Sequence, residues 1–261
     1  MKALVKNELR LTRKMLLIWM GIVLILCGFA YFEYLSLKDS LNELTGLISD
    51  FPKILKAMFG VSDDLASALG WYGCIYYWGA MLTNSYAVYL GASCVAKEQA
   101  QGTAEYLFTK PVSRSKVVCA KAVARVCNLL VLAVFSGVCN YFTAILPLGG
   151  LEQRGAVLST TVGLLLTGLT LFAITLLFSG LTRTYKGAVR IGAGTLLLFY
   201  GISITAEYLD APMLYCLTPL KFFDVYTVAT SGIQFSFLLL AMIIVIGSVI
   251  AAQRVWTNRE I

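Results

Sequence analysis

Long uncharged apolar runs alternate with short charged segments along the chain, and this pattern predicts its architecture. The hydrocarbon core of a bilayer is about 30 Å thick and is crossed by a helix of about 20 apolar residues. Six runs meet or approach that length, so we expect six transmembrane helices in an all-α membrane protein. They are predicted over residues 15–35, 70–96, 115–147, 155–180, 188–206 and 233–254.

Two of these runs need a further argument. The fifth is the shortest, and it spans the bilayer only if Lys186 and Arg190 extend their long side chains to the interface. The first follows a basic segment and resembles a secretory signal in that respect. Its apolar part is too long, however, and aromatic residues from Phe29 to Tyr34 stand where a small-residue cleavage site would lie. We therefore expect an uncleaved first span.

The segments before and after the first span are amphipathic. Residues 1–14 predict a basic interfacial elbow helix attracted by anionic lipid, with an ordinary basic flank that only sets topology as the alternative. Residues 36–69 carry apolar side chains at helical spacing and form an outer amphipathic segment, in which Pro52 starts a new helical turn.

Composition and charge agree with a bilayer environment. Hydrophobic residues make up 59% of the 261 residues and charged residues 13%, far from the values of a soluble domain. Placing both termini in the cytoplasm puts 16 of the 21 basic residues on the inner side, as the positive-inside rule requires. These basic residues are spread over four short segments rather than one face, so we expect no nucleic-acid partner.

Several kinds of chemistry have no residues to support them. The chain contains no histidine and no Gly-Lys dipeptide, which excludes histidine-based catalysis and the phosphate-binding loop of ATPases. None of the seven cysteines forms a C-x-x-C pair, so we expect no metal site. Acids within the spans are limited to Glu33 and Glu207, both near outer ends. The chain is therefore expected not to be an enzyme and to bind no cofactor itself.

The segment of residues 97–114 between the second and third spans is the main cytoplasmic loop. Its sequence predicts a short helix before Pro111, a turn at Lys110 and a new helix capped by Ser113. A charged helical loop of this length is a suitable docking surface for a partner.

The residues of this loop carry a resemblance to a known family. Glu98, Gly102-Thr103, Glu105, the run from Pro111 to Arg114, and Lys121 together closely resemble the signature loop of the ABC-2-type permeases, which are membrane subunits of bacterial ABC exporters. Residues 51–60 (FPKILKAMFG) and 218–224 (TPLKFFD) are similar to two further family segments. The resemblance covers essentially the whole chain, residues 1–261, as one permease domain.

The resemblance implies a partner and an arrangement. In the family, the main loop forms a coupling helix that docks on a separate ATPase subunit, which binds ATP and magnesium, and residues 181–187 form a smaller contact. It also implies outer re-entrant helices over residues 207–232, a location in the plasma membrane and a second permease copy, which we expect to form a homodimer. The coupling residues carried over are Glu98, Gly102, Thr103, Glu105, Pro111, Arg114, Arg183 and Lys186. Each of them has an alternative role in shaping its loop or setting topology.

Small and hydroxyl residues along the fourth and fifth spans, and tyrosines along the second, suggest a translocation path. Close helix packing is the alternative for all of them. The candidates are Tyr76, Tyr77, Thr167 and Thr175, whereas Trp71 and Tyr72 are expected in an interfacial aromatic belt.

The scarcity of charge within the spans favours an amphipathic substrate, namely a peptide, a lipid-like molecule or a drug, with peptide export preferred. Two other functions stay open. One is a channel or secondary transporter that works without ATP, and the other is a membrane scaffold or sensor with a permease-like fold.

Overall fold

Helices make up the protein as seen in the computed structural model, which describes residues 2–62, 64–100, 114–149, 153–182 and 184–257. Within these ranges no strand is present. The long helices are α1 (Lys2–Leu37), α4 (Ala68–Ala100), α6 (Arg114–Asn140), α7 (Arg154–Leu181), α8 (Tyr185–Tyr208) and α10 (Phe235–Thr257). The short ones are α2 (Leu41–Ser49), α3 (Lys53–Phe59), η1 (Tyr141–Ile145), η2 (Leu146–Leu148), η3 (Pro212–Leu217), η4 (Pro219–Lys221) and α9 (Val225–Ser231).

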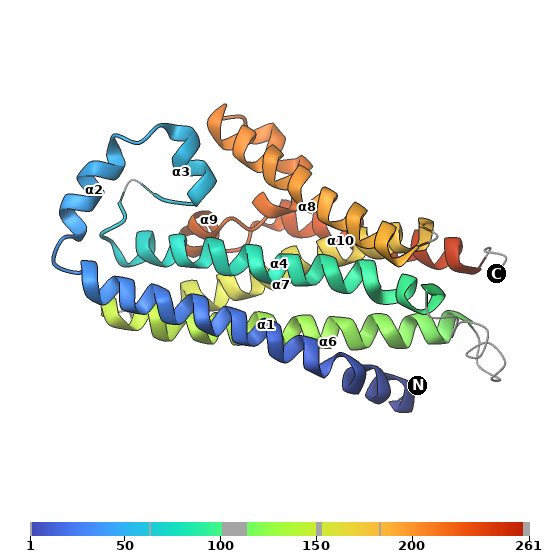
Figure 1. Ribbon diagram of the computed structural model, residues 1–261. Helices are drawn as coiled ribbons and strands as arrows, with labels where there is room; N and C mark the ends of the chain where they lie inside the picture. Colours follow the sequence, from blue (N-terminus) through green and yellow to red (C-terminus); the bar gives the residue numbers. More distant parts are fainter. Residues whose placement is uncertain (1, 63, 101–113, 150–152, 183, 258–261) are drawn as a thin grey trace.

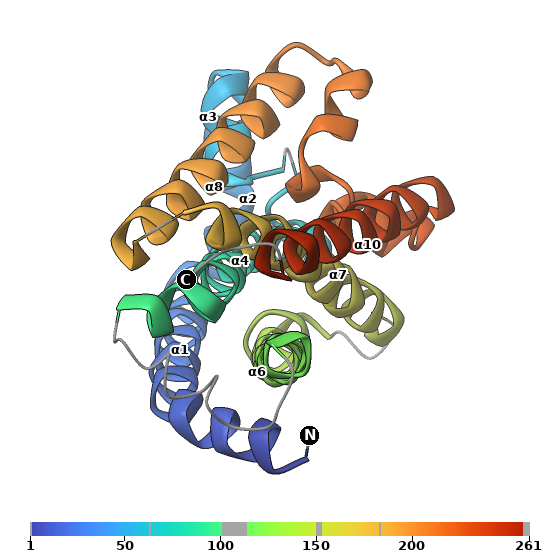
Figure 2. The same cartoon turned by 90° about the vertical axis from the view of Figure 1, so that its right-hand side faces the viewer.

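The long helices form a bundle with distinct ends. Helices α2 and α3 lie at one end, and both chain ends lie at the other (Figure 1). Seen along the bundle in Figure 2, α4 lies in the middle, and it packs against α1, α6, α7 and α8. Helix α4 is therefore the most enclosed element of the described fold.

Five stretches of the described chain are long and apolar enough to cross a membrane. They are Lys2–Leu37, Lys116–Ile145, Arg154–Leu181, Tyr185–Tyr208 and Phe235–Trp256, and they coincide with five of the six predicted spans. Helix α4, which contains the predicted span 70–96, is not among them. Its polar residues Thr83, Asn84 and Ser93 are buried against neighbouring helices, so this helix is largely enclosed by protein. Its crossing of the membrane stays a prediction.

Helix α1 differs from the sequence prediction at its N-terminal end. Residues 2–14 form no separate elbow, because α1 continues unbroken for 36 residues. No proline or glycine interrupts its first 19 residues. This end of α1 packs along α6, where Lys121 donates to Glu8 at 2.8 Å and Asn128 donates to Thr12 at 2.6 Å. Contact with α6 explains why the segment follows the bundle.

The outer segments are short helices, as the sequence predicts. Pro52 precedes α3, and Gly60 ends that helix in the left-handed conformation with φ +66°. In the second outer segment, the Asp224 carboxylate accepts hydrogen bonds from the backbone N–H groups of Tyr226 and Thr227 and caps α9.

The expected position of Trp71 and Tyr72 in an interfacial belt is wrong. Trp71 is 4% exposed and Tyr72 is fully buried, because both lie on α4 and face the bundle. The Tyr72 hydroxyl hydrogen-bonds the Thr160 hydroxyl of α7. Their amphipathic rings therefore join two helices instead of anchoring the protein at the lipid interface.

Candidate functional site

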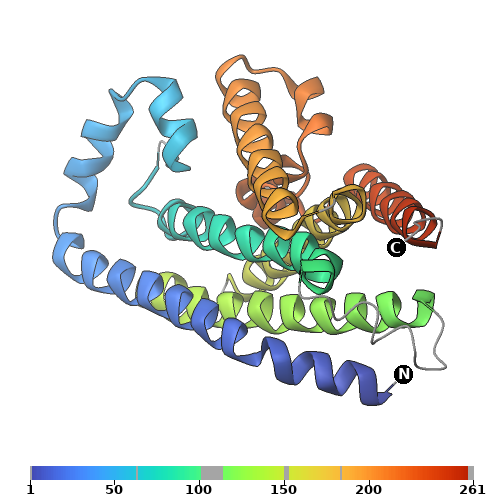
Figure 3. The same cartoon turned by 45° about the vertical axis from the view of Figure 1, so that its right-hand side comes forward.

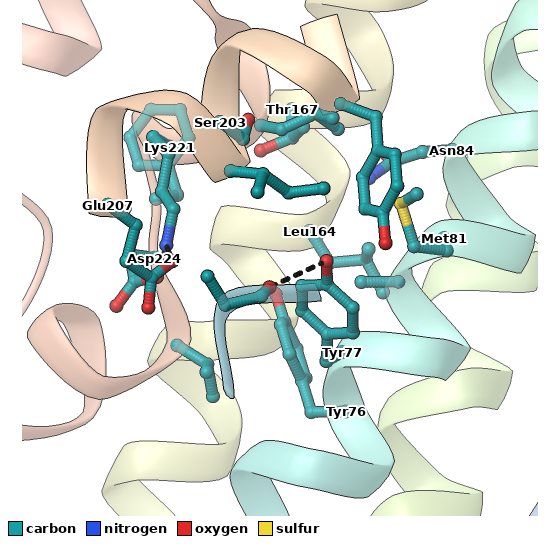
Figure 4. Close-up of a pocket in the computed structure, with 17 residues that line it drawn as sticks. Tyr76, Tyr77, Met81, Asn84, Leu164, Thr167, Ser203, Glu207, Lys221 and Asp224 are labelled. Carbon is teal, nitrogen blue, oxygen red and sulfur yellow. Dashed lines mark hydrogen bonds and ion pairs between the residues drawn. The ribbon is translucent and has the colours of Figure 1, made fainter. Parts of the chain in front are cut away.

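A cavity opens between α4, α7 and α8, beneath α3 and beside the segment from η4 to α9 (Figure 4). Its walls are formed by Ala57, Tyr76, Tyr77, Ala80, Met81, Asn84, Leu164, Thr167, Tyr200, Ser203, Ile204, Glu207, Leu220, Lys221, Phe223, Asp224 and Val225. In Figure 4, Glu207, Lys221 and Asp224 lie on one side, and the α4 residues Tyr76, Tyr77, Met81 and Asn84 lie on the other. We call this space the central cavity.

Three of the four predicted path residues line the central cavity. They are Tyr76, Tyr77 and Thr167. Thr175 lies elsewhere, packed against Gly91 of α4 so closely that a Cβ on that glycine would lie 2.1 Å from the threonine oxygen. Thr175 is also fully buried and donates to the Leu171 carbonyl, so its place in the fold is that of a packing residue.

Three tyrosine hydroxyls of the cavity wall donate to backbone carbonyls. Tyr76 donates to the Thr160 carbonyl at 3.0 Å, and Tyr77 donates to the Ala57 carbonyl at 3.4 Å. Tyr200 donates to the Met58 carbonyl at 2.8 Å. Such groups present only oxygen lone pairs to a molecule inside the cavity.

A cluster of three charged groups closes one side of the cavity. The Lys221 ammonium lies 2.8 Å from a Glu207 carboxylate oxygen and 3.0 Å from one of Asp224. Burial alone would lower the pKa of Lys221, but the charges of Asp224 and Glu207 and their hydrogen bonds raise it above its ordinary value. Lysine therefore stays protonated, and the cluster carries one cation for two carboxylates.

A second cavity adjoins this cluster. It shares Tyr77, Glu207, Lys221, Asp224 and Val225 with the central cavity. Its other walls come largely from α3 and the outer segments, namely Lys53, Lys56, Gly60, Val61, Ser62, Pro212, Tyr215, Phe222, Tyr226, Thr227, Gln234 and Phe237. The charged cluster thus stands between a cavity inside the bundle and one at the end that carries α2 and α3.

Helix α3 covers the central cavity and is held there by its carbonyl groups. The last carbonyls of a helix lack partners within the helix. Tyr77 of α4 and Tyr200 of α8 donate to the carbonyls of Ala57 and Met58, and Tyr226 of α9 donates to that of Gly60 at 3.1 Å. Three different helices therefore fasten one end of α3, and burial raises the pKa of Tyr226 to about 12, so its hydroxyl stays a donor.

Asn84 occupies the cavity wall near the middle of α4. Its side chain is 3% exposed, and its Oδ1 has no hydrogen-bond partner among the described residues. A buried carbonyl oxygen without a donor costs about 1–3 kcal/mol. The sequence analysis did not single out this residue, although a polar side chain at the middle of an apolar run was the available signal.

Most of the predicted coupling residues lie outside the described residues. Gly102, Thr103, Glu105, Pro111 and Arg183 belong to this group. Glu98 is in the last turn of α4, and α6 begins at Arg114, one residue after the predicted Ser113 cap.

Lys186 is exposed in the first turn of α8, which Thr184 caps by accepting from the Gly187 N–H at 3.1 Å. The C-terminal end of α4 and the N-terminal ends of α6 and α8 lie at the same end of the bundle as the two chain ends (Figure 3).

The sequence analysis also missed a buried ion pair. Lys121 was placed with the inner loop, yet its side chain is buried in α6 against Glu8. The two residues are 113 positions apart, so no local pattern connects them. Among the described residues, no group of three His, Cys, Asp or Glu side chains could hold a metal ion.

These features define a membrane protein built from apolar helices around a cavity with polar side chains, with charged groups toward the end that carries α2 and α3. A comparison with protein-family models identifies the family. The model described as ABC-2 family transporter protein matches residues 2–236. The chain therefore belongs to the ABC-2 family, whose members are membrane subunits of ABC transporters and imply an ABC ATPase partner. No curated protein sequence matches the chain.

Proposed function

We propose that the chain is the transmembrane subunit of an ATP-driven exporter that moves an amphipathic substrate out of the cell. A separate ATPase subunit binds ATP and magnesium and docks on residues 97–114 and 181–187. The observation that carries this proposal is a polar cavity inside the bundle of an ABC-2 family chain, lined by three residues that the sequence marks as a path. The class of substrate is a peptide, lipid-like molecule or drug, and a peptide is our preference.

The positions of the chain ends support six crossings. Both ends lie at the same end of the bundle, and this requires an even number of crossings. Five helices qualify by length and apolarity, and the central helix α4 supplies the sixth. The end with both termini also carries the end of α4 at Ala100 and the start of α6 at Arg114, the residues that border the basic inner loop, so it is the cytoplasmic side in this proposal.

A second copy of the chain completes the path in this proposal. The apolar stretches of α8 and α10 are 17% and 11% buried within one copy, so both helices have large apolar faces available for lipid or a partner. We expect a homodimer with two ATPase subunits. Native mass spectrometry of the detergent-purified complex tests the ratio, and one permease per two ATPases contradicts it.

Affinity purification of the tagged chain from its own membranes tests the proposal. We expect an ATPase with a phosphate-binding loop to co-purify in equal amount and to hydrolyse ATP. Asp50→Lys, on the outer end of the bundle, is a control that leaves the yield of ATPase unchanged. A monodisperse chain that never brings down an ATPase contradicts the proposal and favours an ATP-independent channel, transporter or scaffold.

A further inference from the structure

A groove runs along the junction of α6 and α7 on the surface of the bundle. It has a volume of about 480 Å³ and shares no lining residue with either cavity described above. Its apolar side chains include Val134, Val138 and Phe142 on the side of α6 and η1, and Leu158 and Val162 on the side of α7. These five side chains are between 46% and 68% exposed. No segment of the described chain therefore fills the groove.

The floor of the groove is a close contact between the two helices. A Cβ on Gly137 would lie 2.3 Å from the hydroxyl oxygen of Thr161, and both residues line the groove. The Thr161 hydroxyl donates to the Val157 carbonyl at 2.7 Å, so its proton is not available to a ligand. The interior of the groove is therefore suited to a hydrocarbon chain rather than to a polar molecule.

The length and position of the groove match one leaflet of a bilayer. Both helices belong to stretches that are long and apolar enough to cross a membrane. The groove follows residues 154–162 of α7, which rise about 12 Å at 1.5 Å per residue. Half of the hydrocarbon core is about 15 Å thick. The groove lies at the C-terminal end of α6 and the N-terminal end of α7, away from the two chain ends (Figure 1). An acyl chain of this leaflet can lie along it.

Arg154 stands at the headgroup end of the groove. It is the first residue of α7, and its exposed side chain lines the groove. Its Nε donates to the Tyr141 hydroxyl at 3.3 Å, which links the guanidinium to η1 on the opposite wall. No carboxylate of the described residues forms an ion pair with it. The remaining N–H groups of a guanidinium match the oxygens of a phosphate.

We propose that this groove binds one phospholipid, with the phosphate on Arg154 and an acyl chain between the apolar side chains of α6 and α7. A cation at the membrane surface, above an apolar groove as deep as one leaflet, is complementary to this molecule in charge and in shape. The bound lipid completes the packing of two helices that touch at Gly137 and diverge on either side. This inference goes beyond the proposed function and requires no ATPase.

The experiment uses the full chain in phosphatidylcholine nanodiscs with a small fraction of a photoactivatable lipid. The probe is phosphatidylglycerol with a diazirine on one acyl chain, and diacylglycerol with the same chains is the matched probe without a phosphate. Labelled residues are mapped by mass spectrometry after irradiation, with the lipid-facing parts of α8 and α10 as the internal reference. We expect phosphatidylglycerol to label residues 134–142 and 154–162 about tenfold more than diacylglycerol does.

Variants identify the site. Arg154→Gln removes the charge from an exposed position and is expected to reduce labelling by phosphatidylglycerol to the level of diacylglycerol. Val138→Phe narrows the groove at a half-exposed position and is expected to reduce labelling by both probes. Lys38→Gln is the control, because Lys38 is an exposed cation at the same end of the bundle that does not line the groove.

Equal labelling of the groove by the two probes overturns the inference, because ordinary boundary lipid gives that result. Labelling by phosphatidylglycerol that is unchanged in Arg154→Gln also overturns it. A groove that neither probe labels, while α8 and α10 are labelled, contradicts a lipid and indicates that a second copy of the chain covers this face. All these measurements are made without the ATPase, so their outcome is independent of the proposed function.

Discussion

Lys221 shows how a single residue stabilises the outer part of this protein. It contacts Glu207 at the end of α8 and Asp224 at the start of α9, and its side chain is 14% exposed. A buried charge that loses its partners is far more costly than an exposed one. The cluster therefore holds two outer elements together around the cavity.

Replacement of Lys221 by methionine leaves two carboxylates facing each other without a cation. We expect the free energy of unfolding to fall by about 3 kcal/mol, measured by thermal or chemical denaturation in detergent. Lys53→Met is the matched control, because Lys53 pairs with Asp210 at a site where the two side chains are 47% and 79% exposed. That change is expected to cost less than about 1 kcal/mol, and equal effects of the two contradict the account.

The pH dependence of this stability has a definite sign. The folded-state pKa of Lys221 is raised above its ordinary value of 10.5. A raised pKa stabilises the fold below the unfolded-state pKa, and this contribution disappears as pH rises through the folded-state value. The stability difference between wild type and Lys221→Met is therefore constant from pH 7 to about 10 and shrinks at higher pH. A difference that stays constant as pH rises above about 10.5 contradicts this assignment.

Single residues of the site were predictable only where the residue type itself carries the signal. Tyrosines and threonines within apolar runs are unusual enough to mark Tyr76, Tyr77 and Thr167 as path candidates. The same signal selected Thr175, which packs on Gly91, because composition does not report which face of a helix meets a cavity. The roles of Asn84 and Lys221 could not be predicted from the sequence. Lys221 pairs with Glu207 of another helix, and the Asn84 Oδ1 has no partner among the described residues, and both facts are visible only in the folded structure.

Helices α1 and α6 show the same dependence at the scale of elements. Their ranges follow from apolar runs, but their pairing depends on Glu8 and Lys121, whose side chains are 12% and 6% exposed. A basic N-terminal segment read alone predicts an interfacial elbow. In the structure, the contact between Glu8 and the buried Lys121 holds this segment along α6.

A double-mutant cycle tests the contact between these two helices. Glu8→Leu leaves Lys121 buried without its carboxylate and is expected to cost about 3–5 kcal/mol of unfolding free energy. Adding Lys121→Met removes the second charge of the pair, so the double variant is expected to lose less than the sum of the two single variants. Additive effects of the two changes in denaturation experiments contradict a buried pair.

Helix α3 is short, so its position depends on its contacts. Removing the hydroxyls of Tyr200 and Tyr226 by phenylalanine leaves two of its final carbonyls without donors. We expect hydrogen exchange of residues 53–61 to accelerate by about tenfold in the double variant, because each lost bond contributes about 1 kcal/mol. Tyr141→Phe, whose hydroxyl accepts from Arg154, is the control and leaves this segment unchanged. Unchanged exchange in the double variant contradicts the role of the tyrosines.

The whole molecule has an apolar exterior and a hydrophobic core in which a smaller set of polar groups is buried. Helices α1, α8 and α10 carry the most apolar surface, whereas α4 contributes buried polar groups and falls outside the five stretches identified by hydropathy. Five of the six predicted spans were predictable from run lengths, since a helix must be apolar wherever it meets lipid. The central place of α4 was not, because a helix enclosed by protein can carry polar residues that hydropathy counts against it.

The central claim is that this chain works with a separate ATPase docked at its cytoplasmic end. The most direct measurement is the rate of ATP hydrolysis by the purified ATPase subunit before and after the chain is added in lipid nanodiscs. The rate is predicted to rise with the wild-type chain and with Asp50→Lys at the outer end, and to stay at the level of the isolated ATPase with Glu105→Lys in the docking loop. An ATPase whose rate and binding are the same with and without the chain contradicts the account.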